Sequence, residues 1–229
     1  MLSNLIGPIA DGRLTWLEPV GIGFFDCDEF RRQQDWPDVY DADYFAKYQE
    51  MARTPIGQRL NAFRVALVAR YALQLQRPDV TVLDVGIGDG AFLRGIESFE
   101  PVKMIPAGMD VNPVGIAYLK ERDQLVPDPW PRCADIVTFW DSLEHIRDPR
   151  EHLKMTRAYA IVSLPVFADA LDAQGSKHFR PEEHFWYFTR MGFAQFAQQE
   201  GFEVVDVLAT ESAIGRESIE TFVLKRRRV

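Results

Sequence analysis

The chain of 229 residues has few cysteines and fewer positive than negative charges. Its two cysteines, Cys27 and Cys133, are too few for a disulfide framework or a cysteine-rich metal site, which favours a reducing, cytoplasmic location. The net charge of −8 argues against indiscriminate attraction to nucleic acid. No apolar run reaches the roughly 18 residues of a membrane-spanning helix, and no secretory signal is recognisable, so we expect no membrane association.

The composition that is present suits a globular protein with a sizeable core. Hydrophobic residues make up 47% of the chain and aromatic residues 12%. The length fits one large domain, or one domain with an appendage. Residues 225–228 (KRRR) form the one strongly basic cluster, which we interpret as a solvated strand end. A phosphate or membrane contact is the alternative interpretation of that cluster.

The most informative stretch is a β-branched run that leads directly into three glycines. Residues 80–85 (VTVLDV) are typical of a buried parallel strand, and Gly86, Gly88 and Gly90 follow. Glycines at alternate positions permit a tight turn and a close approach of the backbone to a ligand. Asp110 ends the next apolar stretch, about 20 residues beyond the glycines, where an acidic side chain can hold the hydroxyls of a ribose.

The charges beside the glycines indicate which nucleotide the turn receives. Gly86, Gly88 and Ala91 satisfy the loose dinucleotide pattern G-x-G-x-x-A, which is weak evidence by itself. A pyrophosphate prefers uncharged backbone amides, whereas Asp84 and Asp89 flank this turn and would repel it. The two carboxylates suit a ligand with cationic groups, such as the ammonium and sulfonium of S-adenosylmethionine.

At this point the sequence resembles the class I S-adenosylmethionine-dependent methyltransferases, over about residues 78–225. Residues 83–90 (LDVGIGDG) are similar to the first motif of that family, residues 108–113 (GMDVNP) to its ribose-binding segment, and residues 134–146 (ADIVTFWDSLEHI) to the segment after its fourth strand. The proline-rich residues 123–132 leave little room for the third strand of the family, so the residue that contacts the adenine is not assigned. The cofactor-binding residues that the resemblance implies are Asp84, Gly86, Gly88, Gly90, Asp110, Val111 and Asp141.

The pattern of alternating strands and helices predicts an α/β fold, with a Rossmann-like parallel sheet, helices on both faces and an antiparallel C-terminal hairpin. Strands are expected near residues 80–85, 103–109, 135–140, 160–164, 202–210 and 218–225. Helices are expected near residues 41–51, 55–76, 90–98, 112–122 and 149–159, and from Thr189 to about Glu200.

We divide the chain into an N-terminal part and a core. Residues 1–77 are expected to form an irregular segment and helices that cover the active site. Residues 78–229 are expected to form the cofactor-binding methyltransferase core, with an aromatic insert near residues 166–188. Connections of this length tend to be lids or binding loops, so the insert is expected to cover the acceptor, although an aromatic arm packed on the domain is the alternative. The side chains expected to face it are Tyr44, Phe45 and Tyr48.

Three polar residues follow a core strand at its carboxyl end, where ligands bind in open α/β sheets. They are Asp141, Glu144 and His145. An imidazole beside the cofactor can accept the proton of a hydroxyl, so His145 is the expected base, held by Glu144. The Asp-Pro-Pro-Tyr type of motif of amino-group methyltransferases is absent, which shifts the expected acceptor atom from nitrogen toward oxygen.

The same cluster raises the question of a metal ion. Some metal-dependent O-methyltransferases carry a similar acid-x-x-Glu-His cluster, with another histidine in a later segment. By that resemblance the ligands of a divalent ion would be Asp141, Glu144, His145 and His184. Many metal-free relatives keep a similar Glu-His pair as a structural link under the cofactor, and we expect no tightly bound metal.

The sequence therefore predicts a cytoplasmic enzyme that transfers a methyl group from S-adenosylmethionine to a hydroxyl of a small-molecule acceptor. One alternative is methylation of a nucleotide, RNA or DNA, with residues 225–228 or the insert as the docking surface. Another is a cofactor-binding interaction module without turnover. The sequence specifies neither the acceptor nor the oligomeric state.

Overall fold

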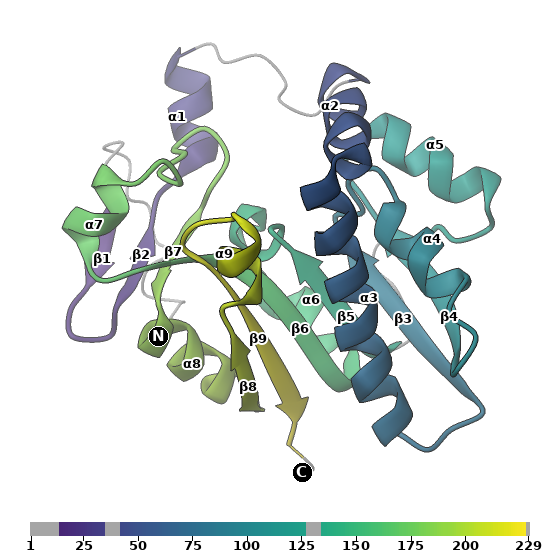
Figure 1. Ribbon diagram of the computed structural model, residues 1–229. Coiled ribbons are helices and arrows are strands. Elements are labelled where there is room, and N and C mark those ends of the chain that lie inside the picture. Colours follow the sequence, from purple (N-terminus) through teal and green to yellow (C-terminus); the bar gives the residue numbers. More distant parts are fainter. Residues whose placement is uncertain (1–13, 35–41, 127–133, 228–229) are drawn as a thin grey trace.

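The structure is a computed structural model that describes residues 14–34, 42–126 and 134–227. It contains a mixed β-sheet with helices on both faces (Figure 1). The strands are β1 (Thr15–Leu17), β2 (Ile22–Phe24), β3 (Asp79–Val85), β4 (Lys103–Met109), β5 (Ala134–Trp140), β6 (Thr156–Phe167), β7 (Trp186–Thr189), β8 (Phe202–Leu208) and β9 (Ile219–Arg226). The helices are α1 (Cys27–Gln34), α2 (Ala42–Arg53), α3 (Pro55–Gln74), α4 (Ala91–Glu97), α5 (Pro113–Glu121), α6 (Arg150–Lys154), α7 (Ala170–Gly175), α8 (Arg190–Gln199) and α9 (Thr210–Ile214).

The centre of the sheet is parallel, and its C-terminal end is an antiparallel hairpin. The strand order is β1-β2-β7-β6-β5-β3-β4, and β9 pairs with both β6 and β8. β4, β3, β5 and β6 run parallel, whereas β9 is antiparallel to β6 and to β8. Every residue of β5 is buried, as expected for a parallel strand covered on both faces. The predicted fold class is therefore confirmed.

The edge beside β4 carries a single bridge in place of a further strand. Gly108 donates its N–H to the carbonyl of Gln124 at 2.8 Å and accepts the N–H of Val126 at 3.0 Å. This bridge, between Gly108 and Leu125, is the extent of the pairing in the described residues. The rest of the proline-rich stretch, from residue 127, lies outside them, as does Cys133.

One predicted helix is wrong in its second half. A helix was expected over residues 149–159, but α6 ends early and β6 begins at once. Thr156 pairs with Ala134, and Tyr159 pairs with Ile136, both on β5. Pairing on β5 and burial against the core outweigh the local helical pattern, since tertiary contacts override weak propensities.

The aromatic insert is built into an extension of the sheet. β6 continues beyond the core and pairs in parallel with β7 at Val166 and Phe167. β7 in turn pairs antiparallel with β2, and β2 with β1. Trp186 and Tyr187 of β7 are fully buried. The N-terminal hairpin and the end of the insert, far apart in sequence, therefore form one continuous layer with the core.

The N-terminal helices α1 and α2 lie at the end of the sheet where the parallel strands have their carboxyl ends (Figure 1). Thr54 caps α3, because its hydroxyl oxygen accepts the N–H of Gly57 at 3.0 Å, and Pro55 follows at the first helical position. α3 packs against α4 and α9 and thereby covers one face of the sheet. α1 and α2 lie above the sheet edge in Figure 1 and border the site described below.

One arginine of the basic C-terminal cluster makes contacts within the fold. Arg226 donates hydrogen bonds to the carbonyls of Thr156, Glu200 and Lys154, and its guanidinium lies 4.6 Å from the ring centroid of Phe202. Arg228 lies outside the described residues.

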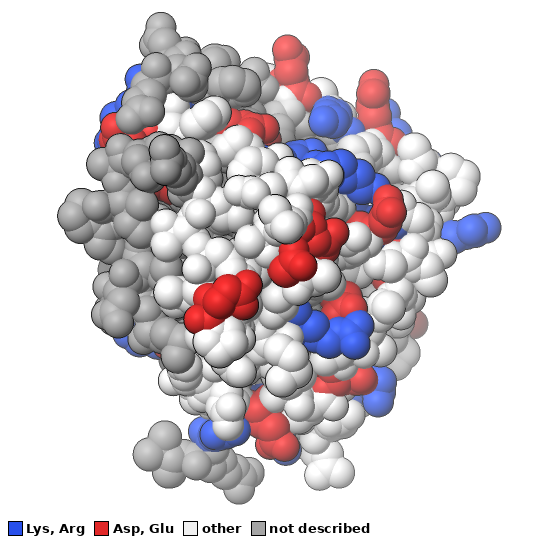
Figure 2. Space-filling view, turned by 90° about the vertical axis from the view of Figure 1, so that its left-hand side faces the viewer, with Lys and Arg blue, Asp and Glu red and all other residues white. Residues whose placement is uncertain are grey.

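The face in Figure 2 carries acidic and basic side chains interspersed among uncharged ones. Among the described helices, none is sufficiently long and apolar to cross a membrane.

Candidate active site

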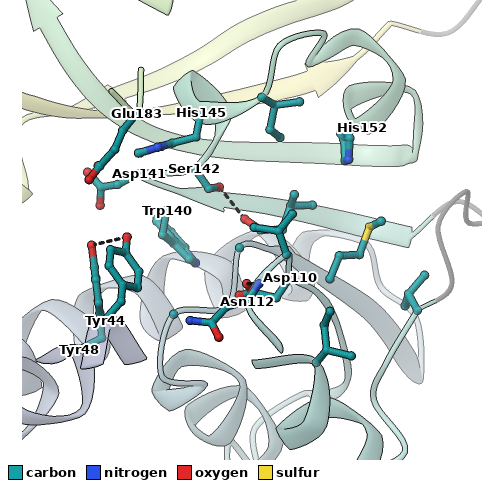
Figure 3. Close-up of a pocket in the computed structure, with 18 of the residues that line it drawn as sticks. Tyr44, Tyr48, Asp110, Asn112, Trp140, Asp141, Ser142, His145, His152 and Glu183 are labelled. Atoms are coloured by element: carbon teal, nitrogen blue, oxygen red, sulfur yellow. Dashed lines mark hydrogen bonds between the residues drawn. The ribbon is translucent and has the colours of Figure 1, made fainter. Parts of the chain in front are cut away.

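A cavity of about 650 Å³ lies at the carboxyl ends of β3, β4 and β5. The glycine turn, the residues after β4, the segment after β5 and the helices α1 and α2 all contribute to its walls. Figure 3 shows Tyr48, Asp141, His145 and Glu183 gathered at one end, away from Asp110. The cavity therefore has a glycine-turn side, which suits a nucleoside, and an opposite end that mixes aromatic and titratable groups.

Two of the three glycines of the turn border the cavity. All three have positive φ angles, +81° at Gly86, +57° at Gly88 and +73° at Gly90, which only glycine adopts without strain. Gly86 and Gly88 line the cavity. A Cβ at Gly86 would lie 2.8 Å from the Cβ of Ser142, and one at Gly90 would lie 2.5 Å from the ring of Tyr118. Gly90 is the N-cap of α4 and does not border the cavity, so its expected contact with the cofactor stays a prediction.

Asp110 borders the cavity directly after β4. Its Oδ2 accepts the backbone N–H of Ile87 at 2.9 Å, and its Oδ1 accepts that of Asn112 at 2.7 Å. Burial raises the pKa of Asp110, and these backbone donors oppose the shift. Each carboxylate oxygen has a second lone pair, so a side chain fixed at two points can still accept hydrogen bonds from two adjacent ribose hydroxyls. The arrangement fits the predicted function of Asp110. Val111, exposed beside it, also lines the cavity.

Asp84 lies outside the lining of the cavity. It is fully buried, and its Oδ1 accepts the hydroxyl of Thr138 at 2.6 Å. Burial raises the pKa of Asp84 to about 7. Its Oδ2 is buried without a hydrogen-bond partner among the described residues. Asp84 supports the end of β3 from within the sheet, and its expected contact with the cofactor stays a prediction.

Asp141 lines the cavity and is held by two arginines. Its Oδ2 accepts from Nη2 of Arg64 at 3.0 Å and from Nη1 of Arg216. Burial alone would raise the pKa of Asp141, but the charges of Arg216 and Arg64 outweigh it and hold the pKa below its ordinary value. Asp141 is therefore a stable carboxylate, suited to receive a cationic group and unsuited to take up a proton.

The structure brings together three of the four predicted metal ligands. Candidate ligand atoms of Glu144, His145 and His184 lie within 4.8 Å of one another, and the rings of His145 and His184 are 4.5 Å apart between centroids. Asp141 is instead directed at its arginines. Of the three clustered residues, His145 alone borders the cavity, because Glu144 and His184 are buried behind it.

The cluster fits a divalent cation only in part. Oε2 of Glu144 and Nδ1 of His184 have no hydrogen-bond partner in the part of the chain that is described, which leaves two potential ligand atoms. Hard cations such as Mg²⁺, however, are usually held with waters and substrate oxygens, and these two groups do not border the cavity. Burial, together with the charge of Asp141, raises the pKa of Glu144 well above its ordinary range. The geometry therefore does not require a metal.

Glu183 belongs to the site but was not expected from the sequence. It borders the cavity near His145 (Figure 3) and is 8% exposed. Its Oε2 accepts from Nη1 of Arg180 at 2.9 Å. Glu183 stands in an acidic pair with Glu182, just before the aromatic strand, and this pair was the available signal. Nothing in the sequence indicates which of the two carboxylates faces the cavity.

Two of the three aromatic residues expected to face the insert do line the cavity. Tyr44 and Tyr48 lie on one side of α2, and the hydroxyl of Tyr44 donates to that of Tyr48 at 3.1 Å. Phe45 is buried and does not border the cavity. Together with Trp140 from the end of β5, the tyrosines give this end of the cavity an aromatic wall.

Comparisons with known proteins agree on one family. A protein-family model described as “Methyltransferase domain” matches residues 48–207. This match spans the glycine turn, Asp110, the segment after β5 and the aromatic insert. A search of curated proteins found no match.

Solved structures share the fold at low sequence identity. The magnesium protoporphyrin IX methyltransferase from Synechocystis PCC 6803 with bound SAH (S-adenosylhomocysteine) superposes with a TM-score of 0.58 at 12% identity, covering 85% of this chain and 99% of its own. An S-adenosylmethionine-dependent methyltransferase from Clostridium acetobutylicum gives 0.58 at 11% identity, with 80% and 99% covered. The plantazolicin methyltransferase BpumL gives 0.54 at 13% identity, with 88% and 94% covered.

Proposed function

The chain belongs to the methyltransferase-domain family and is an S-adenosylmethionine-dependent methyltransferase, and we propose that its acceptor is a hydroxyl group of a small molecule. The cofactor supplies a methyl group on a sulfonium, which is a good leaving group, so positioning carries most of the catalysis. The observation that supports the proposal is the imidazole of His145, which borders the cavity at the end opposite Asp110.

Some residues of the cavity bind the cofactor in this proposal, and others contact the acceptor. Gly86 and Gly88 let the backbone approach the cofactor, and Asp110 accepts hydrogen bonds from its ribose. Asp141 receives its ammonium. The N-terminal helices and the insert cover the acceptor end, where Tyr44 and Tyr48 pack against an apolar or aromatic acceptor.

His145 takes up the proton that the acceptor hydroxyl loses. Burial lowers the pKa of His145 to about 4, against the opposing charges of Glu183 and Asp141. The ring is therefore neutral at pH 7 and able to accept a proton. Asp141 does not compete for that proton, because Arg64 and Arg216 keep it ionised. Glu144 supports His145 from behind, and Glu183 stabilises the imidazolium that forms.

The surface supports a small-molecule acceptor over a nucleic acid. Arg226, in the basic cluster, donates hydrogen bonds from its guanidinium to three backbone carbonyls. The lining of the cavity offers no excess of positive charge to a phosphate backbone, because its cations, Arg31 and Lys120, are outnumbered by Asp110, Asp141 and Glu183. We propose that the enzyme acts in the cytoplasm on a small molecule, without a tightly bound metal.

The test is the chemistry of the product. The purified chain is incubated with deuteromethyl-labelled S-adenosylmethionine and matched pairs of small phenols, alcohols and amines, with total RNA as a separate arm. We expect label in an O-methyl ether, with the same turnover after chelation by EDTA. Label only on nitrogen or only in RNA would contradict the proposed acceptor. One equivalent of divalent metal per chain, with turnover lost on chelation, would assign a metal to the Glu144, His145 and His184 cluster.

A further inference from the structure

Four charged side chains form a largely buried network next to the cavity. Glu211, on α9, is entirely shielded from solvent. Its Oε1 accepts from Nε of Arg64 at 2.9 Å, and its Oε2 accepts from Nη2 of Arg64 at 3.0 Å and from Nη1 of Arg216 at 2.9 Å. The same two arginines hold Asp141. Glu211 and Asp141 are thus connected through two shared donors, and of the four, Asp141 borders the cavity.

The network is anchored on rigid elements. Ser163 on β6 donates its hydroxyl to Oε1 of Glu211 at 2.9 Å and lies 2.7 Å from the hydroxyl of Thr221 on β9. The guanidinium of Arg64 lies 4.8 Å from the ring centroid of Trp140, at the end of β5. Glu211 is therefore fixed by the sheet and can in turn fix the two arginines.

Asp141 needs such support. Its φ angle is +54°, in the left-handed region that residues with a side chain seldom adopt. Its N–H donates to the carbonyl of Ser163 at 2.9 Å, which holds the backbone, and the two arginines hold the carboxylate. The conformation directs the side chain of a strand-end residue into the cavity (Figure 3).

The charges of the network balance, with two guanidinium groups against two carboxylates. S-adenosylmethionine carries a positive charge on sulfur that its product, SAH, lacks. Nearby charges act strongly on one another where solvent is excluded, so a change in the net charge of the network alters the affinities of these two ligands unequally.

We propose that Glu211 is a positioning residue that orients Asp141 through Arg64 and Arg216 and, by neutralising these arginines, keeps their charge from disfavouring the cationic cofactor relative to its product. The inference rests on the proposed role of Asp141 in holding the cofactor. Glu211 touches neither ligand, and its effect is transmitted by the two arginines.

The experiment measures the dissociation constants of S-adenosylmethionine and SAH by calorimetry on the full chain. Glu211→Gln leaves the network with one extra positive charge, so the ratio of the cofactor constant to the product constant is expected to rise by about fivefold or more. Arg216→Gln leaves one extra negative charge, and the ratio is expected to fall. The double variant is expected to return near the wild-type ratio. The matched control is Glu217→Gln, which removes an exposed carboxylate paired with Lys177.

The two single variants are expected to change the ratio of dissociation constants in opposite directions, and this distinguishes positioning from a loss of structure. A merely structural role would weaken both ligands together in both single variants and leave the ratio unchanged, which would overturn the inference. If Glu211→Gln does not fold, the Arg216→Gln variant alone tests the inference. Arg216 lies at the outer side of the network, and its side chain is 26% exposed. If Asp141→Asn changes neither constant while the Glu211 variant shifts the ratio, the proposed role of Asp141 fails, the positioning role of Glu211 fails with it, and only the charge effect of Glu211 stands.

Discussion

Replacing His145 by asparagine is expected to lower the rate of methyl transfer by about 10²- to 10⁴-fold, the usual contribution of a positioned general base. Affinity for SAH is expected to stay within about twofold, because His145 lies at the acceptor end of the cavity. The matched control is His178→Asn. His178 lies on the insert, outside the cavity lining, with Nε2 2.9 Å from the carbonyl of Glu217. A His145 variant that turns over at the wild-type rate would remove the imidazole from the mechanism.

The same assay yields a pH dependence with a definite sign. A base works in its neutral form, so activity is lost as the pH falls through the pKa of the group. With the pKa of His145 lowered to about 4 by burial, activity is expected to persist at pH 5.5, where an unshifted histidine of pKa about 6.5 would be mostly protonated. Glu183 and Asp141 raise this pKa, and Arg180 and Arg31 lower it. Glu183→Gln is therefore expected to move the loss of activity to still lower pH. A loss centred near pH 6.5 in the wild type would contradict the buried, neutral ring.

Replacing Trp186 by alanine is expected to lower the free energy of unfolding by about 3–5 kcal/mol, as measured by urea denaturation. Trp186 is fully buried, and its ring centroid lies 4.8 Å from that of Phe24 in the N-terminal hairpin. Its Nε1 donates to the carbonyl of Ile146 at 2.9 Å and contacts that of Arg147 at 3.2 Å. The side chain thus joins the hairpin, the insert and the segment that carries His145. Truncation would open a cavity where these parts meet.

The control for this variant is Leu171→Ala on α7, a position 79% exposed, where a change within about 0.5 kcal/mol is expected. A loss below about 1 kcal/mol for the Trp186 variant would show that the insert contributes little to the cooperative core. The end of the insert forms β7, and its residues Trp186 and Phe188 are both buried. That the insert covers the acceptor stays a prediction.

The cofactor end of the cavity was predictable because its determinants are local. The glycines at residues 86 and 88 indicate a tight turn whatever surrounds them, and both have positive φ angles. The strand before the turn is identified by its own apolar run. Asp110 follows the next strand, so the sheet alone brings it beside the turn. Asp84 shows the limit of this reasoning, because its hydrogen bond from Thr138, on another strand, and its absence from the cavity lining depend on contacts that the local pattern does not encode.

The acceptor end depends on contacts between distant segments, which local patterns do not encode. Arg64 and Glu211 stand 147 positions apart and have no motif in common, yet they meet beside Asp141. Glu183, not Glu182, borders the cavity, and its N–H donates to the carbonyl of Arg180 at 3.0 Å in a tight turn. Glu144 and His145 are adjacent in sequence, but only the histidine borders the cavity.

The most direct test of the account is calorimetric titration of the chain with SAH, alongside Asp110→Ala and with NAD as the competing nucleotide. We predict one SAH site per chain, no binding of NAD, and a dissociation constant raised about 30- to 150-fold by Asp110→Ala, equivalent to about 2–3 kcal/mol for the loss of hydrogen bonds from a charged acceptor to two ribose hydroxyls. The variant is first shown to unfold cooperatively, because Asp110 also accepts the N–H groups of Ile87 and Asn112. Binding of NAD in place of SAH, or an SAH affinity unchanged by the variant, would contradict the assignment of this cavity to S-adenosylmethionine.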